Sequence, residues 1–226
     1  MPILSDIDLK EAIKNGEIQI TPPPTSIEPA SIDLSVGEEA FAASGNEIIK
    51  LSQGKLLVIP PGEMVLIITK EEIKLGNGIV GHIGLRSYFT RKGLVLLAGP
   101  QIDPGFDGTL HICLCNLSPA EIVLSYGESF CTIELHRLSN NAEQPYKGNY
   151  QKQKGITSRE IDDIRERRGY ALSEVIKDMQ SIARDVSSLK ESVEKLTTRT
   201  DKYMLMFVSS LVALVIGIIL KLFVFK

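Results

Sequence analysis

The chain has 226 residues, of which 43% are hydrophobic and 23% charged, with a formal net charge of −3. This is enough for one well-buried domain with extensions. The slight negative charge gives no reason to expect nucleic acid as a partner. No secretory signal opens the chain, because Asp6, Asp8 and Lys10 interrupt any apolar run near the start.

Residues 5–15 predict a short capped helix. Ser5 or Asp6 can serve as its N-cap, and Asn15 followed by a glycine is a typical stop. Apolar residues within the helix are spaced for burial on one face, and we expect them to contact the core. They are Ile7, Leu9 and Ile13.

From residue 31 to about 138 the chain consists of short β-rich runs separated by turn residues. Runs of this length, with glycine and proline between them and no helical periodicity, predict a compact all-β barrel or sandwich. The three cysteines lie on such runs, and we interpret them as reduced thiols of a cytosolic domain. They are Cys113, Cys115 and Cys131.

Strand alternation over residues 109–117 places four side chains on one face. They are Thr109, His111, Cys113 and Cys115. The His-x-Cys-x-Cys pattern invites a zinc site, but its three potential ligands spread along about 13 Å of strand, too far apart to meet on one ion. The sequence supports no metal site built from protein ligands alone.

Residues 84–116 combine basic groups with a turn that holds an acid. Arg86, Ser87 and Arg91 could aim guanidinium and hydroxyl groups at one anion, as phosphate recognition requires, or form a solvated charged loop. Asp103 lies between Ile102 and a Pro-Gly pair, which favours a turn that holds the acid at the mouth of a strand. A structural, turn-capping aspartate is the alternative.

These motifs resemble those of the dCTP deaminase / dUTPase family, and of its deaminase branch especially. Arg86-Ser87, Ala98-Gly99 and residues 102–108 (IDPGFDG) match that branch in order and spacing. Residues 29–34 (PASIDL) upstream and residues 147–155 (KGNYQKQKG) downstream extend the resemblance to residues 1 to about 160.

The resemblance implies a distorted jelly-roll, dUTPase-like β-barrel that forms homotrimers with active sites between subunits. It also implies binding of dCTP or dUTP, with Mg²⁺ on the phosphates. Residues 146–159 would form a flexible lid over the nucleotide. The nucleotide-binding residues implied are Arg86, Ser87, Arg91, Gln101, Ile102, Asp103, Tyr146 and Gln153.

One position departs from the deaminase pattern. Deaminases have a glutamate ten residues after the motif aspartate, where it acts as general acid/base, and this chain has Cys113. A thiol does not simply replace a carboxylate there, because its usual pKa is far higher and it offers one weak donor. Asp103 is retained, and in the dUTPase branch the matching aspartate positions the attacking water.

A heptad repeat follows the β region. Its a and d positions predict a coiled coil, and a parallel trimer would match the symmetry implied for the head. A single helix packed on the barrel is the alternative. The repeat positions are Leu172, Val175, Met179, Ile182, Val186, Leu189, Val193, Leu196, Thr200 and Tyr203.

The repeat leads into residues 204–220, which carry no charge. About 20 apolar residues cross the hydrocarbon of a bilayer, so this stretch, with Lys221 able to snorkel, predicts a membrane span. The protein would then be single-pass and anchored by its C-terminal helix in the lipid bilayer, with the β domain in the cytoplasm.

The predicted organisation is a β domain over residues 1–138, a nucleotide-closing tail and linker over 139–170, a coiled-coil stalk over 171–203 and a transmembrane anchor over 204–225. The charged run at residues 159–168 is interpreted as a solvated helix face. Three functions remain open. They are a membrane-tethered dCTP deaminase, a dUTP or dCTP pyrophosphatase in which Asp103 orients water, and a catalytically silent nucleotide receptor that signals through the stalk.

Overall fold

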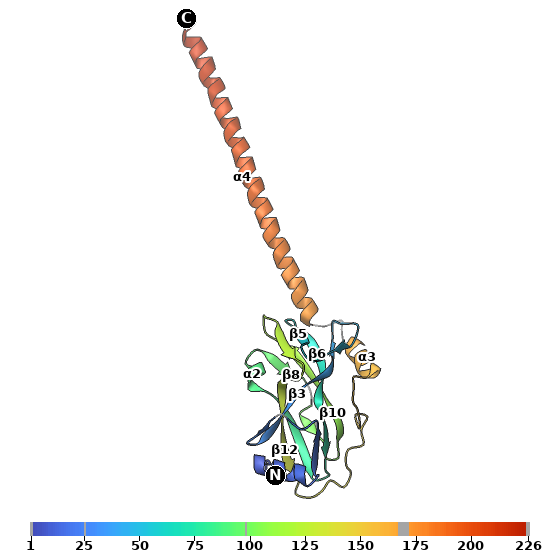
Figure 1. Cartoon of the computed structure of the whole chain (residues 1–226). Coiled ribbons are helices and arrows are strands. Elements are labelled where there is room, and N and C mark those ends of the chain that lie inside the picture. The colour runs from blue at the N-terminus through green and yellow to red at the C-terminus, as the bar shows by residue number, and fades with distance from the viewer. Residues whose placement is uncertain (1, 25, 98, 167–171, 225–226) are drawn as a thin grey trace. The chain divides into compact units, whose positions relative to one another are not determined.

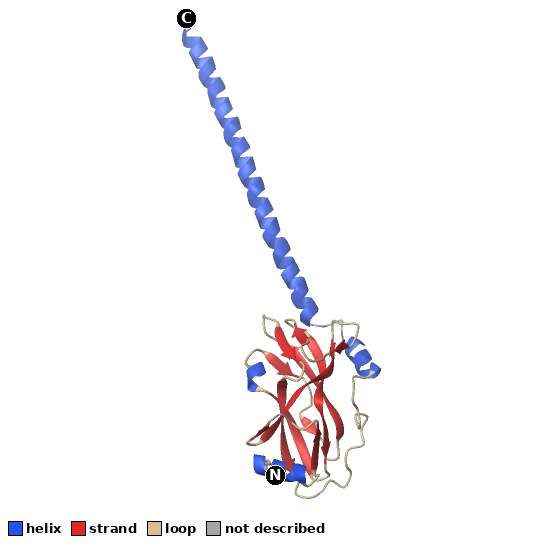
Figure 2. Cartoon of the chain, viewed as in Figure 1, coloured by secondary structure: helices blue, strands red, loops and turns tan. Residues whose placement is uncertain are grey.

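The computed structural model describes residues 2–24, 26–97, 99–166 and 172–224. The chain divides into two compact units, Met1–Ile176 and Lys177–Lys226, and each is described by itself. The first is a mainly β head, and the second consists of helix α4 (Leu172–Val224) beyond its first residues (Figures 1 and 2). This confirms the predicted β head followed by a long helix. Ala98 of the Ala-Gly motif, residues 167–171 and residue 225 lie outside the described residues.

The head contains the following elements, in chain order: α1 (Asp6–Lys14), β1 (Ile18–Thr21), β2 (Ile27–Glu28), β3 (Ser31–Ala42), β4 (Ile49–Lys50), β5 (Leu56–Ile59), β6 (Met64–Leu75), β7 (Ile79–Leu85), α2 (Ser87–Thr90), β8 (Leu94–Leu96), β9 (Gln101–Ile102), β10 (Asp107–Asn116), β11 (Ile122–Ser125), β12 (Ser129–Arg137) and α3 (Ser158–Glu166).

Helix α1 begins with a capping box. The Ser5 hydroxyl accepts a hydrogen bond from the Asp8 amide, and the Asp8 carboxylate accepts one from the Ser5 amide. Leu9 is fully buried, as expected. The expectation for Ile7 was wrong, because its side chain is 71% exposed and Ala12 occupies the buried position instead. The core-facing stripe of this short helix is narrower than the apolar spacing suggested.

Strand β3 joins the two halves of the main sheet. Its first residues pair with β12, and its later residues pair with β6, so one strand passes from one half to the other. The order through the main sheet is β8-β10-β6-β3-β12-β7-β9, and β5 pairs separately with β11. All these pairings are antiparallel. Together they form the layered β fold that short runs separated by turns predicted.

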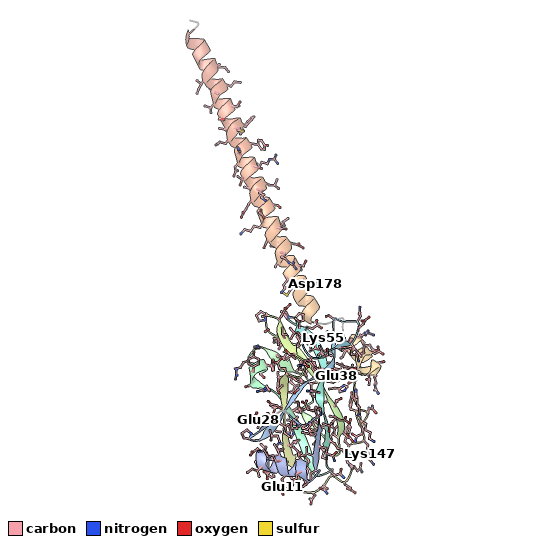
Figure 3. The ribbon with its side chains drawn as sticks, viewed as in Figure 1. Glu11, Glu28, Glu38, Lys55, Lys147 and Asp178 are labelled. Carbon is pink, nitrogen blue, oxygen red and sulfur yellow. The ribbon has the colours of Figure 1, made fainter. Side chains whose placement is uncertain are left out.

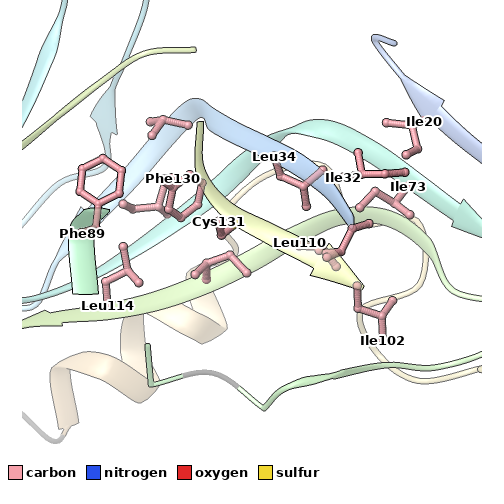
Figure 4. Packing of buried hydrophobic residues seen from close by; sticks show 14 of the residues in the cluster. Ile20, Ile32, Leu34, Ile73, Phe89, Ile102, Leu110, Leu114, Phe130 and Cys131 are labelled. Atoms are coloured by element: carbon pink, nitrogen blue, oxygen red, sulfur yellow. The ribbon is translucent and has the colours of Figure 1, made fainter. Parts of the chain in front are cut away.

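Both halves of the sheet contribute to one apolar core. Side chains from β3, β6, β10 and β12 interdigitate there, and Phe89 of α2 packs against them (Figure 4). Phe89, Phe130 and Leu114 are at most 2% exposed. The labelled charges of the head, among them Glu11, Glu28 and Lys147, lie on its outside (Figure 3).

Strand β10 has the predicted alternation. Leu110, Ile112 and Leu114 face the core, whereas His111 and Cys113 are only partly buried on the opposite face. All three cysteines are free thiols, and Cys131 is buried. The outward face of β10 therefore places the side chains of His111 and Cys113 outside the main apolar core.

Helix α4 carries an unbroken apolar stripe and then an apolar segment. By length and composition this helix could cross a membrane. Heptad positions whose side chains the structure describes are exposed, including Val175, Ile182, Leu189 and Leu196. The Leu172 side chain lies outside that description.

Candidate functional site

A cavity of about 420 Å³ lies on the outward face of β10. Three groups of residues supply its polar and aromatic lining: the end of β9 with the turn after it, the outward side chains of β10, and the tail that follows the β domain. The polar and aromatic lining residues are Gln101, Asp103, Phe106, Thr109, His111, Cys113, Tyr146, Tyr150 and Glu160.

The turn after β9 presents Asp103 to the cavity. Pairing of β9 with β7 places Gln101 and Ile102 beside the strand residues His82 and Gly81, and Ile102 is buried. The Gln101 amide donates a 2.6 Å hydrogen bond to the Asp103 carboxylate. This hydrogen bond fixes the orientation of the Asp103 carboxylate.

The tail runs along β10 and closes over the cavity. Tyr146 donates its amide hydrogen to the carbonyl of Pro104 at 2.8 Å, and its ring packs on Phe106 at 5.9 Å between centroids. Further along, the carbonyl of Gln153 accepts hydrogen bonds from the amide and the hydroxyl of Thr109 at 2.9 and 3.0 Å. Of the two predicted tail residues, Tyr146 therefore lines the cavity, whereas Gln153 lies behind the lining and contacts His111 and Glu160.

Gln151 also belongs to the tail contacts, and sequence reasoning missed it. Its side chain donates to the carbonyl of Gly105 at 2.9 Å and accepts from the amide of Asp107 at 3.2 Å. No sequence signal distinguishes it from Gln153, because both are glutamines in a polar segment.

Helix α3 brings Glu160 into the cavity, where sequence reasoning had placed a solvated helix face. Its Oε1 lies 2.8 Å from Nδ1 of His111. Ile161 and Ile164 pack with a small apolar cluster that includes Cys113. The interpretation of residues 159–168 as a solvated helix face holds for exposed charges such as Asp162 and Asp163, but it was wrong for Glu160, because the other face of α3 is docked on the sheet.

Hydrogen bonds keep Glu160 ionised. Burial acts to raise the pKa of its carboxyl, but hydrogen bonds from His111 and from the backbone and side chain of Thr157 outweigh burial and lower the pKa to about 2. Thr157 and Glu160 form a capping box at the start of α3. The Thr157 amide and hydroxyl donate to Oε2 of Glu160 at 2.9 and 2.8 Å, and the Glu160 amide donates to the Thr157 hydroxyl. The Thr-x-x-Glu spacing was the one sequence signal at Glu160, and it indicates a helix start rather than a site.

Cys113 lines the cavity as a neutral thiol. Burial, and to a smaller extent the neighbouring Cys115, raises its pKa to about 11. At neutral pH this group neither accepts a proton as a carboxylate would nor acts as a nucleophile.

The basic segment lies apart from this cavity. Arg86 caps the four-residue helix α2, and Arg86, Ser87 and Arg91 are exposed and outside the cavity lining. The Nε atom of Arg86 lies 3.3 Å from Asp33, a carboxylate only 5% exposed. Burial raises the pKa of Asp33, and Arg86 opposes that rise. Within one chain, the predicted phosphate ligands and Asp103 therefore form two separate groups.

Among the described residues, no cluster of three or more histidine, cysteine or carboxylate side chains could hold a metal ion. A divalent ion at this site would need oxygens from a ligand, such as phosphate oxygens, in addition to protein groups.

Several known proteins are similar to this chain in sequence. The dCTP deaminase-like family model matches residues 3–138. A dCTP deaminase of Pyrococcus abyssi is 44% identical over 126 residues, covering 56% of this chain and 80% of that protein. A probable deoxyuridine 5'-triphosphate nucleotidohydrolase of Sulfolobus islandicus rod-shaped virus 1 is 40% identical over 156 residues, covering 69% and 96%.

Among solved structures, the 2'-deoxycytidine 5'-triphosphate deaminase of Agrobacterium tumefaciens matches with a TM-score of 0.51 at 18% identity. The match covers 61% of this chain and 48% of that one. At this identity the likeness concerns the fold.

Proposed function

This chain belongs to the dCTP deaminase-like family, and on that premise we propose that its head binds a pyrimidine deoxynucleoside triphosphate in the cavity beside Asp103. The observation that carries the proposal is the convergence of the motif residues Gln101, Ile102 and Asp103 with the tail residue Tyr146 around one cavity. At about 420 Å³ this cavity is within the usual range for small-ligand sites.

The phosphates would be held by Arg86, Ser87 and Arg91, with Mg²⁺ bound between phosphate oxygens. Because these residues lie outside the cavity of their own chain, we infer that a neighbouring copy supplies them in a homotrimer. The Asp33 carboxylate contacts Nε of Arg86, and the Ser129 carbonyl accepts from its Nη1 at 3.4 Å, so the side chain is preset. The Arg86 guanidinium then has further donors for a phosphate.

Helix α4 would hold this trimer at a membrane, with residues 171–203 as the coiled-coil stalk and 204–225 as the anchor. Two observations support this: the heptad side chains that the structure describes are exposed, and the helix is apolar enough to span a bilayer. The head would lie on the cytoplasmic side.

A second candidate function is hydrolysis of the triphosphate. The Gln101 hydrogen bond favours it, because it holds the Asp103 carboxylate in one orientation, as an acid that positions water requires. The products would be a nucleoside monophosphate and pyrophosphate.

The test uses the full chain in lipid nanodiscs with Mg²⁺ and, separately, dCTP, dUTP, CTP and dTTP. Calorimetry measures binding, and chromatography of the same samples identifies products. We expect dCTP or dUTP to bind, and Asp103→Asn to weaken that binding at least about tenfold. Asp163→Asn is the matched control, because it removes the same charge from an exposed position on α3.

Ammonia among the products would identify a deaminase, and pyrophosphate would identify a hydrolase. Binding with the nucleotide recovered unchanged would identify a receptor. Absence of binding for all four nucleotides would contradict the proposal.

A further inference from the structure

The cavity contains a second polar centre, formed by His111 and Glu160, that the family motifs do not include. We propose that His111 is the catalytic proton carrier for ring deamination in this chain and that Glu160 is its positioning residue. The inference rests on the proposed nucleotide site and concerns how the site performs chemistry with a thiol at position 113.

Glu160 is unsuited to be the proton carrier itself, because both of its oxygens are occupied. Oε1 accepts from His111, and Oε2 accepts from the Gln153 amide at 2.7 Å and from the amide and hydroxyl of Thr157. A carboxylate with four donors is held as an anion and fixed in place. It can orient a neighbour, and it is a poor acceptor of a further proton.

An anionic partner at Nδ1 selects one form of the His111 ring. Nδ1 donates its hydrogen to Glu160, and in the neutral ring Nε2 is left as the acceptor. The Gln153 amide also lies 3.2 Å from Nδ1, but it is a donor and is directed to Glu160 at the shorter distance of 2.7 Å. The arrangement leaves Nε2 as the nitrogen available for proton transfer.

Nε2 of His111 is buried, and among the described residues it has no hydrogen-bond partner. The His111 side chain is 9% exposed, and the residue lines the cavity. A buried polar nitrogen without a partner carries a desolvation cost that a bound ligand or water removes. His111 therefore lines the cavity with a ring that has one nitrogen short of a hydrogen-bonding partner.

Deamination of the cytosine ring requires two proton transfers, and one residue can carry out both. Water adds to C4 of the cytosine ring, and His111 moves its proton to N3. The proton of the new C4 hydroxyl then passes through His111 to the amino group, the C4–N bond breaks, ammonia leaves and C4=O forms. The sum is dCTP plus water giving dUTP plus ammonia, and His111 ends neutral, as it began.

Several elements carry titratable groups that interact with His111 or line the same cavity. They are Glu160 on α3, Glu39 on β3, Cys113 on β10 itself, and Asp103, Tyr146 and Tyr150 around the cavity.

The test measures ammonia release and calorimetric affinity for dCTP with the full chain in nanodiscs. We expect His111→Gln to lower ammonia release at least about 100-fold, the scale of general acid–base catalysis, with the Kd for dCTP changed less than threefold. His136→Gln is the matched control, because this histidine lies on β12 outside the cavity lining and should retain activity.

Two further variants distinguish a role of His111 in proton transfer from a purely structural role in holding the tail on β10. Cys113→Glu in the His111→Gln background should restore ammonia release, because it supplies a carboxylate acid/base on the same strand face. Glu160→Gln should move the acid limb of the kcat profile to lower pH, because an amide stabilises a protonated ring less than a carboxylate does.

The inference is overturned if His111→Gln retains ammonia release, or if it loses dCTP binding to the same extent as turnover. It is also overturned if the native chain binds dCTP and releases no ammonia, a result that leaves the proposed nucleotide site standing. Failure of the native chain to bind any nucleotide would overturn both.

Discussion

His111 and Glu160 are 49 residues apart in the sequence, yet Nδ1 of the first lies 2.8 Å from Oε1 of the second. This contact joins the outward face of β10 to helix α3 and fastens the tail over the cavity. Gln153 donates to the same carboxylate, so three segments of the head meet at one anion. The chemistry of the site and the closure of its tail therefore depend on the same group.

Acidification should loosen the tail. Glu160 has a folded-state pKa of about 2, below its usual 4.5, so its ionisation stabilises the fold above about pH 4.5, and that stabilisation is lost as pH falls toward 2. Hydrogen exchange at the Thr109 and Lys152 amides, which hold the tail on β10, should rise over this window in the native chain after correction for intrinsic rates. In Glu160→Gln the same amides should exchange faster at neutral pH and lack the transition. Equal exchange in both chains would contradict the assignment.

Gly105→Ala should disturb the site much more than Gly54→Ala. Both glycines have φ of +82°, where a side chain costs about 1–2 kcal/mol. At Gly105 the added Cβ would also lie 2.6 Å from Cβ of Pro145, whereas nothing lies within 4 Å at Gly54. Thermal unfolding should show Gly105→Ala less stable than Gly54→Ala by about 1–3 kcal/mol, the usual cost of overpacking. Equal stability would mean that the tail segment at Pro145 moves away freely.

Arg86 should contribute to stability as well as to ligand binding. Arg86→Ala leaves the buried Asp33 carboxylate without its cation, and we expect a loss of about 1–3 kcal/mol. Burial already raises the pKa of Asp33 above its usual 3.8. The stability lost in Arg86→Ala should therefore shrink as the pH falls through this raised pKa, because the carboxyl becomes neutral. Arg91→Ala, at an exposed position, should change stability by less than about 0.5 kcal/mol. A loss independent of pH would argue against the pair.

Cys113 should be slow to alkylate. With a pKa of about 11 against the usual 9.0, its thiolate fraction at pH 8 is about 100-fold lower than that of a free cysteine. Peptide mapping by mass spectrometry after iodoacetamide treatment should show modification at Cys113 about 100-fold slower than for a cysteine-containing peptide. Fast labelling at Cys113 would show that its thiol is far less buried than the fold indicates.

Self-association should depend on the heptad stripe of α4. Leu189→Asn places a polar group at a d position that is exposed in one chain, and it should lower the trimer fraction in detergent micelles. Ser187→Asn, two residues earlier and off the stripe, is the matched control. Sedimentation equilibrium measures the difference. A trimer unaffected by Leu189→Asn would place the association in the head alone.

Local sequence patterns determined much of this architecture. N-cap chemistry at Ser5 or Asp6 predicted the start of α1, two-residue alternation placed His111 and Cys113 on one face of β10, and turn residues around Asp103 predicted an acid at the end of a strand. Each of these depends on neighbours within a few residues, which is the range that periodicity and capping report. Ile7 shows a limit of such local patterns. Its spacing matches that of the buried residues of α1, but spacing does not tell how much of the helix surface the core covers.

The path of the tail, by contrast, was decided only by the tertiary structure. Residues 159–168 have the composition of a solvated helix, yet Ile161 and Ile164 pack on the same apolar cluster as Cys113, and Glu160 reaches a histidine 49 positions earlier. The sequence by itself determined a β head with a retained Asp103, a Cys113 in place of the family glutamate and an apolar C-terminal helix. Only folding decided that a carboxylate from α3 would stand beside His111, because that contact depends on where a distant segment crosses the sheet.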